Sequence, residues 1–300
     1  IPEPAVTRAS PSRIRLVPSA AASWKPCCGG SETDVRIIPD IPLIEGFGAA
    51  SGKVLLSAVG GGGKTTLLFS LAYASGIGSK GTVRVPGVPD NGSGVITGGA
   101  LITTTTKMFV SQVRDIPGTV WLECLPVLSD AASDAAISGT PDAASEVEAI
   151  LAKAENLIRS GIIPVVTDQR TADKAVNTVV DKATDKKGEK AGPVPLWLPG
   201  RLLSDSGLIR LMLVEADGAR MRPFKAPADH EPRIPAETTV LVPVIGADTF
   251  EGTIETMIHR SERAVNLLAG LGEKVTPSSV LTPRQAAILV RSPYGGLKDC

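Results

Sequence analysis

The sequence predicts an α/β domain with a mostly parallel sheet, helices on both faces and long loop insertions. Short apolar runs typical of buried strands, such as Leu208–Val214, alternate along the chain with segments of helical periodicity, such as Ser145–Ser160. Long stretches rich in glycine and proline interrupt this alternation. Strands that alternate with helices indicate a parallel sheet, because each parallel connection needs a crossover that covers one face.

The first half of the domain supplies three strands and one helix. Lys53–Val59 is an apolar run that predicts a buried strand, and Thr65–Ala74 predicts the helix that follows it. Residues 76–99 hold many glycines and an Asn-Gly pair, so we expect them to form an irregular inserted loop without a regular element. Apolar and β-branched residues predict strands at Ala100–Thr106 and Val120–Cys124.

The second half continues the alternation. Residues 125–144 are rich in Ala, Ser and Asp and are expected to be a surface connection, whereas the apolar residues of Ser145–Ser160 lie on one helical face. Residues 184–195 are polar, with Gly and Pro, and predict a second inserted loop. The remaining elements are expected to be strands at Ile162–Thr167, Leu208–Val214 and Thr239–Ile245, and helices at Ser261–Leu271 and Pro283–Ser292.

Composition excludes several classes of partner. The 300 residues carry 31 basic and 31 acidic side chains and only 3% aromatic residues, which argues against nucleic acid and acidic membranes. No apolar run approaches the roughly 18 residues of a membrane helix, so we expect no membrane association. The four cysteines form no C-x-x-C pair, which fits free thiols in a reducing compartment.

Residues 1–34 are expected to be a disordered or leader-like extension, and residues 35–300 one domain that continues past Cys300. We expect a cytoplasmic protein. Organellar targeting stays open, because residues 5–31 contain basic but no acidic side chains, although their prolines disfavour the amphipathic helix of a transit peptide.

The stretch between the first strand and helix resembles a phosphate-binding loop. Residues 58–65 fit the pattern G-x-x-x-x-G-K-[ST], except that Ala58 replaces the first glycine. Backbone N–H groups of such a loop approach phosphate oxygens, the lysine reaches the β- and γ-phosphates, and the hydroxyl after it binds Mg²⁺. The motif predicts a P-loop NTPase-like fold that binds ATP or GTP with Mg²⁺. The residues expected to contact nucleotide are Gly60, Gly61, Gly62, Gly63, Lys64, Thr65 and Thr66.

Two more stretches are expected to complete this site. The strand ending in "VEADG" places Glu215 and Asp217 where P-loop enzymes hold Mg²⁺, with Gly218 positioned to contact the γ-phosphate. We therefore assign catalytic roles to Lys64, Glu215 and Asp217. The threonine run of "LITTTTKM" ends at the same sheet edge, so Thr105 joins the expected metal ligands, although β-propensity alone explains threonines in a strand.

The motifs together resemble the selenium-dependent hydroxylase accessory protein family, YqeC. The matching pieces are "VGGGGKTTLLFSLA", "LITTTTKM", "LVEADGARMRPFKAPADHEPRIP", "VPVIGAD", "HR" and "LTPRQAAILVRSPYGGLK", in family order from Val54 to Lys298. The resemblance implies a P-loop protein that assists maturation of a molybdenum-containing hydroxylase, with that enzyme or a cofactor-assembly protein as client. It also implies an N-K-x-D-like segment after Lys298, which would select the base; ATP and GTP both stay open.

Several roles have more than one interpretation. Arg220, Arg222 and Lys225 follow the acidic motif and suit either phosphate contacts or ordinary surface charge. With two histidines in the chain and no cysteine beside them, a structural or interface role for His230 and His259 is favoured over a transition-metal site. The leading prediction is a slow NTPase switch. The alternatives are a small-molecule kinase or nucleotidyltransferase acting on a cofactor precursor, and a binding-only scaffold with a degenerate loop.

Overall fold

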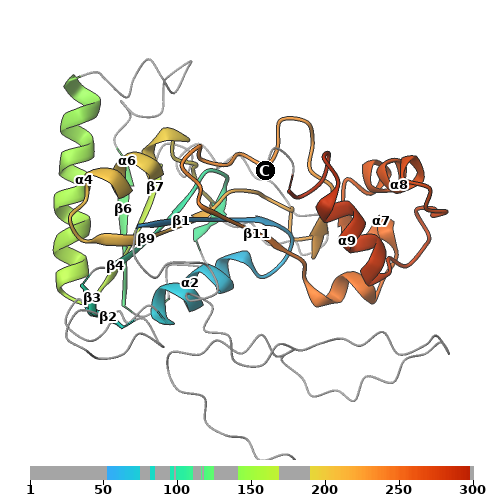
Figure 1. Cartoon of the computed structure of the whole chain (residues 1–300), viewed down its shortest axis with the longest axis horizontal. Helices are drawn as coiled ribbons and strands as arrows, with labels where there is room; N and C mark the ends of the chain where they lie inside the picture. Colours follow the sequence, from blue (N-terminus) through green and yellow to red (C-terminus); the bar gives the residue numbers. More distant parts are fainter. Residues whose placement is uncertain are drawn as a thin grey trace, which may run out of the picture.

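The structure is a computed structural model that describes residues 53–74, 82–84, 95–97, 99–110, 116, 118–124, 141–168 and 190–297. The extension expected at residues 1–34 lies outside this range. The described residues contain one six-stranded sheet (Figure 1). Its strands are β1 (Val54–Gly60), β4 (Gly99–Thr104), β6 (Thr119–Cys124), β7 (Ile163–Asp168), β9 (Ile209–Glu215) and β11 (Val240–Val244).

The sheet is parallel throughout. Its spatial order is β11-β1-β9-β4-β7-β6, and each neighbouring pair runs in the same direction. The α/β class and the mostly parallel sheet predicted from the sequence are therefore confirmed. Each strand of the sheet begins and ends within two residues of its predicted position. Because the strands are parallel, the carboxyl ends of β1, β9 and β4 meet at one edge.

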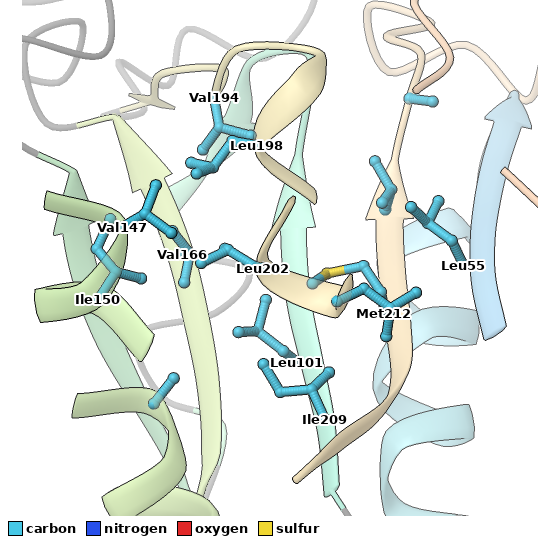
Figure 2. Close-up of a cluster of buried hydrophobic side chains, with 14 of the residues drawn as sticks. Leu55, Leu101, Val147, Ile150, Val166, Val194, Leu198, Leu202, Ile209 and Met212 are labelled. Atoms are coloured by element: carbon cyan, nitrogen blue, oxygen red, sulfur yellow. The ribbon is translucent and has the colours of Figure 1, made fainter. Parts of the chain in front are cut away.

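Helices cover both faces of the sheet. Helix α2 (Lys64–Ala74) packs on one face, while α4 (Pro141–Arg159) and α6 (Trp197–Asp205) pack on the other. Strand β1 serves both layers, because alternate side chains point to opposite faces. Leu56 belongs to the α2 cluster, and Leu55 joins the α4 and α6 cluster that Figure 2 shows. The labelled members of that cluster are Leu55, Leu101, Val147, Ile150, Val166, Val194, Leu198, Leu202, Ile209 and Met212.

A smaller lobe, residues 247–297, lies at one end of the sheet (Figure 1). It contains η4 (Ala247–Phe250), α7 (Ile254–Met257), β12 (Ile258–His259), α8 (Ser261–Gly270) and α9 (Pro283–Arg291). The lobe has its own hydrophobic cluster, to which β10 (Phe224–Lys225) adds Phe224. Strand β10 pairs in parallel with β12, so the segment after β9 connects the main sheet to the lobe.

The structure corrects three expectations about loops. Within residues 76–99, β2 (Thr82–Arg84) and β3 (Val95–Thr97) form an antiparallel pair, because β-branched residues there outweigh the surrounding glycines. Within residues 184–195, β8 (Lys190–Ala191) pairs with β5 (Met108–Phe109). The connection expected at residues 125–144 ends early, because α4 begins with Pro141, a residue suited to a first helical position. Residues 76–81, 85–94, 98, 125–140 and 184–189 of these three stretches lie outside the described residues.

Helix α6 was not predicted. Pro199 and Gly200 make the segment look like a loop, yet Pro199 lies in the first turn, where its missing N–H costs no helical hydrogen bond. Its buried leucines join the cluster under α4. No helix of the part of the chain that the structure describes is both long and apolar enough to cross a membrane.

Candidate functional site

The glycine loop, Gly61–Gly63, connects the end of β1 directly to the start of α2. Gly60, directly before the loop, and Gly63, its last residue, have φ of 94° and 95°, a conformation that favours glycine. The Gly61 N–H donates to the Val244 carbonyl at 2.8 Å, and the Gly62 N–H donates to the Pro223 carbonyl at 3.1 Å. The loop therefore rests on the end of β11 and on the segment before β10.

Lys64 turns back over the glycine loop. Its Nζ donates to the carbonyls of Gly60 and Gly61 at 2.8 and 3.0 Å and lies 4.0 Å from Glu215 Oε1. Burial lowers the pKa of Lys64, and the carboxylates of Glu215 and Asp217 oppose that shift. The ammonium group therefore lies at the N-terminal end of α2. The backbone N–H groups of the first turn of a helix have no hydrogen-bond partner within the helix.

Glu215 ends β9, the strand beside β1, and lies in register with Ala58. The Thr65 hydroxyl donates to Glu215 Oε2 at 2.7 Å. Burial raises the pKa of Glu215, while Lys64 and the Thr65 hydroxyl oppose this. A bound cation would stabilise the charged form further. The structure therefore brings Lys64, Thr65 and Glu215 together as predicted, because Lys64 and Thr65 both contact the carboxylate of Glu215.

Asp217 takes a different position from Glu215. Its carboxylate pairs with the Lys225 ammonium, whose side chain is fully buried and which also donates to the Gly218 carbonyl at 2.8 Å. Lys225 Nζ lies 2.7 Å from Glu231 Oε2 as well. Burial raises the pKa of Asp217, and Lys225 opposes the shift. Lys225 thus joins the acidic motif to the loop that carries Glu231.

Threonine hydroxyls at the end of β4 bind backbone carbonyls. The Thr105 hydroxyl donates to the Arg233 carbonyl at 2.6 Å, and the Thr104 hydroxyl donates to the Glu215 carbonyl at 3.0 Å. Both side chains are buried. These hydrogen bonds attach the acidic motif and the segment around Arg233 to the sheet edge. Thr105 therefore has a structural role next to the candidate metal ligands.

Residues with the chemistry to hold Mg²⁺ meet at the glycine loop. Thr65 and Glu215 offer a hydroxyl and a carboxylate, which suits an ion that takes most remaining ligands from phosphate and water. Asp217 and Thr105 fit less directly, because each is engaged with another partner. Among the described residues, no three His, Cys, Asp or Glu side chains cluster as a metal site of their own.

The remaining candidates lie at the rim. Thr66 is exposed on the first turn of α2, and Arg220 is exposed after Gly218. Arg220 and Met221 both have positive φ, of 49° and 64°, a strained conformation for non-glycine residues that is concentrated at functional sites. The sequence did not reveal that the carbonyl of Pro223 holds the glycine loop. A proline so distant in the sequence carries no pattern that links it to the loop.

Comparison with known proteins places the chain in a family. The profile described as "YqeC protein" matches residues 97–262, more than half of the chain, and the chain belongs to this family. The matched region contains the acidic motif and begins after the glycine loop. The "Uncharacterized protein YqeC" of Escherichia coli (strain K12) is 33% identical over 90 residues, which are 30% of this chain and 33% of that protein. The match thus spans about a third of that relative's length. No solved structure matches the chain.

Proposed function

We propose that the chain binds ATP or GTP with Mg²⁺ at the glycine loop, within a P-loop NTPase-like fold, and acts as a slow NTPase switch. Its client in this proposal is a molybdenum-containing, selenium-dependent hydroxylase or a protein that assembles the cofactor of such an enzyme. One observation supports the nucleotide site most: Lys64 and Thr65, from the start of α2, both converge on Glu215 at the end of the neighbouring strand.

Each residue has a definable role in this proposal. The first turn of α2 offers N–H groups and the positive end of its dipole to a phosphate. Lys64 would exchange its two loop carbonyls for phosphate oxygens, and Thr65 with Glu215 would hold Mg²⁺. The ion, when bound, neutralises charge on the phosphates. Asp217 is engaged by Lys225, which leaves it poorly placed to activate water and favours slow turnover over rapid catalysis.

The family resemblance suggests the client, and the comparisons add no activity to it. A disruption of the gene in its native cell is expected to lower the activity of a molybdenum-containing hydroxylase, and a Lys64→Ala allele should fail to restore it. Unchanged hydroxylase activity in the disrupted strain would remove the client from the proposal without affecting nucleotide binding.

A small-molecule kinase or nucleotidyltransferase is the second candidate. It is favoured by the exposed Arg220 and Arg222, which follow the acidic motif and could grip an anionic acceptor. Nucleotide labelled in the γ-phosphate and in the base distinguishes the two functions. Label found in an acceptor supports transfer, and release of free phosphate alone supports the switch.

Thermal denaturation with nucleotide tests the central proposal. MgATP or MgGTP should raise the melting temperature, because a ligand that binds only the folded state stabilises it. Lys64→Ala should weaken binding by about 2–4 kcal/mol, since the ammonium is lost from the phosphate site. Lys274→Ala, which removes an exposed lysine of the lobe, is the matched control. Wild-type affinity in a folded Lys64→Ala protein would refute the assignment.

A further inference from the structure

A hollow of about 450 Å³ lies between the start of α8 and the turn that follows β9. We call it the basic hollow. Three arginines from two separate segments face it, together with one histidine, and small pockets of this volume are typical of small-molecule sites. Its lining consists of Arg222, Glu255, Ile258, His259, Arg260, Ser261, Glu262 and Arg263.

The arginines of the basic hollow differ in how firmly they are held. Arg260 is paired with both carboxylate oxygens of Glu231, one of them at 3.1 Å. Arg263 donates to Asp229 at 2.6 Å, but the Asp229 side chain is 85% exposed. An exposed ion pair contributes little, so Arg263 is easily released to another anion. Within the described residues, the side chain of Arg222 has no hydrogen bond or ion pair, so its guanidinium is an unneutralised cation at the rim.

Arg263 also has an unsatisfied donor. Its Nε is buried and, among the described residues, donates to no acceptor. A buried donor without a partner costs free energy, so the arrangement with Asp229 alone is not the best one for this side chain. A doubly charged oxyanion in the basic hollow would offer acceptors to Arg222 and Arg263 together, and guanidinium groups match such anions with paired hydrogen bonds.

His259 reports the charge around the basic hollow. Burial, together with the nearby cations Arg260, Lys225 and Arg220, lowers its pKa to about 4, and the carboxylate of Glu231 opposes this shift. The exposed Glu255 and Glu262 add negative charge at the rim, where solvent screens it. The histidine is therefore neutral at neutral pH and lies in a positive potential, the environment that attracts an anion.

We infer that the basic hollow binds a small molecule through a phosphate group, as a second ligand beside the nucleotide site. Arginines from the turn after β9 and from the start of α8 line one space of small-molecule size. Arg222 connects the basic hollow to the glycine loop, because it directly precedes Pro223, whose carbonyl accepts a hydrogen bond from the Gly62 N–H. This inference does not depend on nucleotide binding.

Sulfate, a tetrahedral dianion that does not titrate near neutral pH, is a suitable probe. The chain has two histidines, and His230 is 77% exposed, so a His230→Gln protein leaves one imidazole signal, that of His259, in a proton NMR spectrum. Sodium sulfate is titrated at constant ionic strength against sodium chloride. Sulfate should shift the His259 signal saturably and move its midpoint from about 4 towards the ordinary 6.5, because a nearby anion stabilises the imidazolium.

Variants locate the probe. Arg222→Gln should weaken sulfate binding about tenfold, the effect of one charge-assisted hydrogen bond. Glu262→Gln should strengthen it, because a repelling carboxylate is removed. Arg159→Gln, on α4, is the control for a lost surface charge and should change nothing. Lys64→Ala should also change nothing, which separates the basic hollow from the glycine loop.

A His259 signal that responds to sulfate no more than to chloride would refute a site in the basic hollow, as would equal sulfate affinities of Arg222→Gln and wild type. If Lys64→Ala abolished the response, the anion would be bound at the glycine loop, and a separate second site would be excluded. Failure of nucleotide to bind wild-type protein would contradict the proposed function and leave this result unaffected.

Discussion

The contact between Gly61 and Pro223 leads to a sharp prediction about the glycine loop. A Cβ added at Gly61 would lie 1.8 Å from the Pro223 carbonyl oxygen and 2.6 Å from the Phe224 nitrogen, both of them backbone atoms. Real Cβ atoms essentially never come closer than 3.0 Å to such a neighbour, so the segment must retreat by more than about 1 Å in Gly61→Ala. At Gly62 the nearest atom would be 3.6 Å away, which is ordinary contact.

The cost of Gly61→Ala follows from what the Pro223 carbonyl holds. It accepts from the N–H groups of Gly62 and Gly246, and moving it breaks both hydrogen bonds, at about 1 kcal/mol each. Crowding adds about 1–3 kcal/mol, for a total of about 3–5 kcal/mol. At about 2–4 °C per kcal/mol for a domain of this size, the melting temperature should fall by roughly 6–20 °C.

Thermal denaturation of the two glycine variants, followed by circular dichroism without nucleotide, measures this effect. Gly62→Ala is the matched control and should melt within a few degrees of wild type, since it adds the same methyl group one residue further on. Equal melting temperatures of Gly61→Ala and Gly62→Ala would show that the loop does not rest on Pro223 in solution, and the support described for the loop would be wrong.

Two further predictions concern the carboxylates. Glu215→Gln should preserve nucleotide binding without metal, while the increase in nucleotide affinity that Mg²⁺ causes falls sharply. Asp217→Asn should chiefly lower stability, because it leaves the buried Lys225 ammonium with one carboxylate fewer. Titration of Mg²⁺ against a fluorescent nucleotide measures both effects, and wild-type metal dependence in Glu215→Gln would refute the role of Glu215 in holding Mg²⁺. Burial acts to raise the pKa of Glu231, but hydrogen bonds from Arg260, Lys225 and Ala228 outweigh it and lower the pKa to about 2. The lowered pKa contributes stability above pH 4.5 that is lost as the pH falls towards 2, so urea denaturation of wild type and Glu231→Gln should converge in that window, and a constant difference would contradict this.

Local sequence patterns were sufficient to locate the six strands of the sheet. The strands are apolar runs between breakers, and a buried parallel strand has no other requirement that the sequence must show. Lys64, Thr65 and Glu215 could be brought together in advance, because the helix start after β1 and the end of β9 fall on the same sheet edge. This prediction required only that β9 lie next to β1, and the two strands are neighbours in the sheet.

The contacts between irregular segments could not be read in the same way. Thr105 donates to Arg233, 128 residues away, and a hydroxyl on a strand end gives no sign of which carbonyl it will meet. Lys225 reaches Asp217 and Glu231 across turns whose backbone follows no periodicity. Such pairings are decided by the path of the loops, and charge patterns alone are compatible with solvent exposure for all three residues.

The pairing of β1 also has a consequence for the order of events during synthesis. β1 lies between β9 and β11, whose residues in register with Leu56 are Leu213 and Val240, more than 150 positions further along the chain. At about 5–20 residues per second, the ribosome needs roughly 10–40 s after making the glycine loop to complete β11. The glycine loop and Lys64 therefore remain part of an unpaired, apolar segment until β9 and β11 have been made, and the proposed nucleotide site cannot assemble before then.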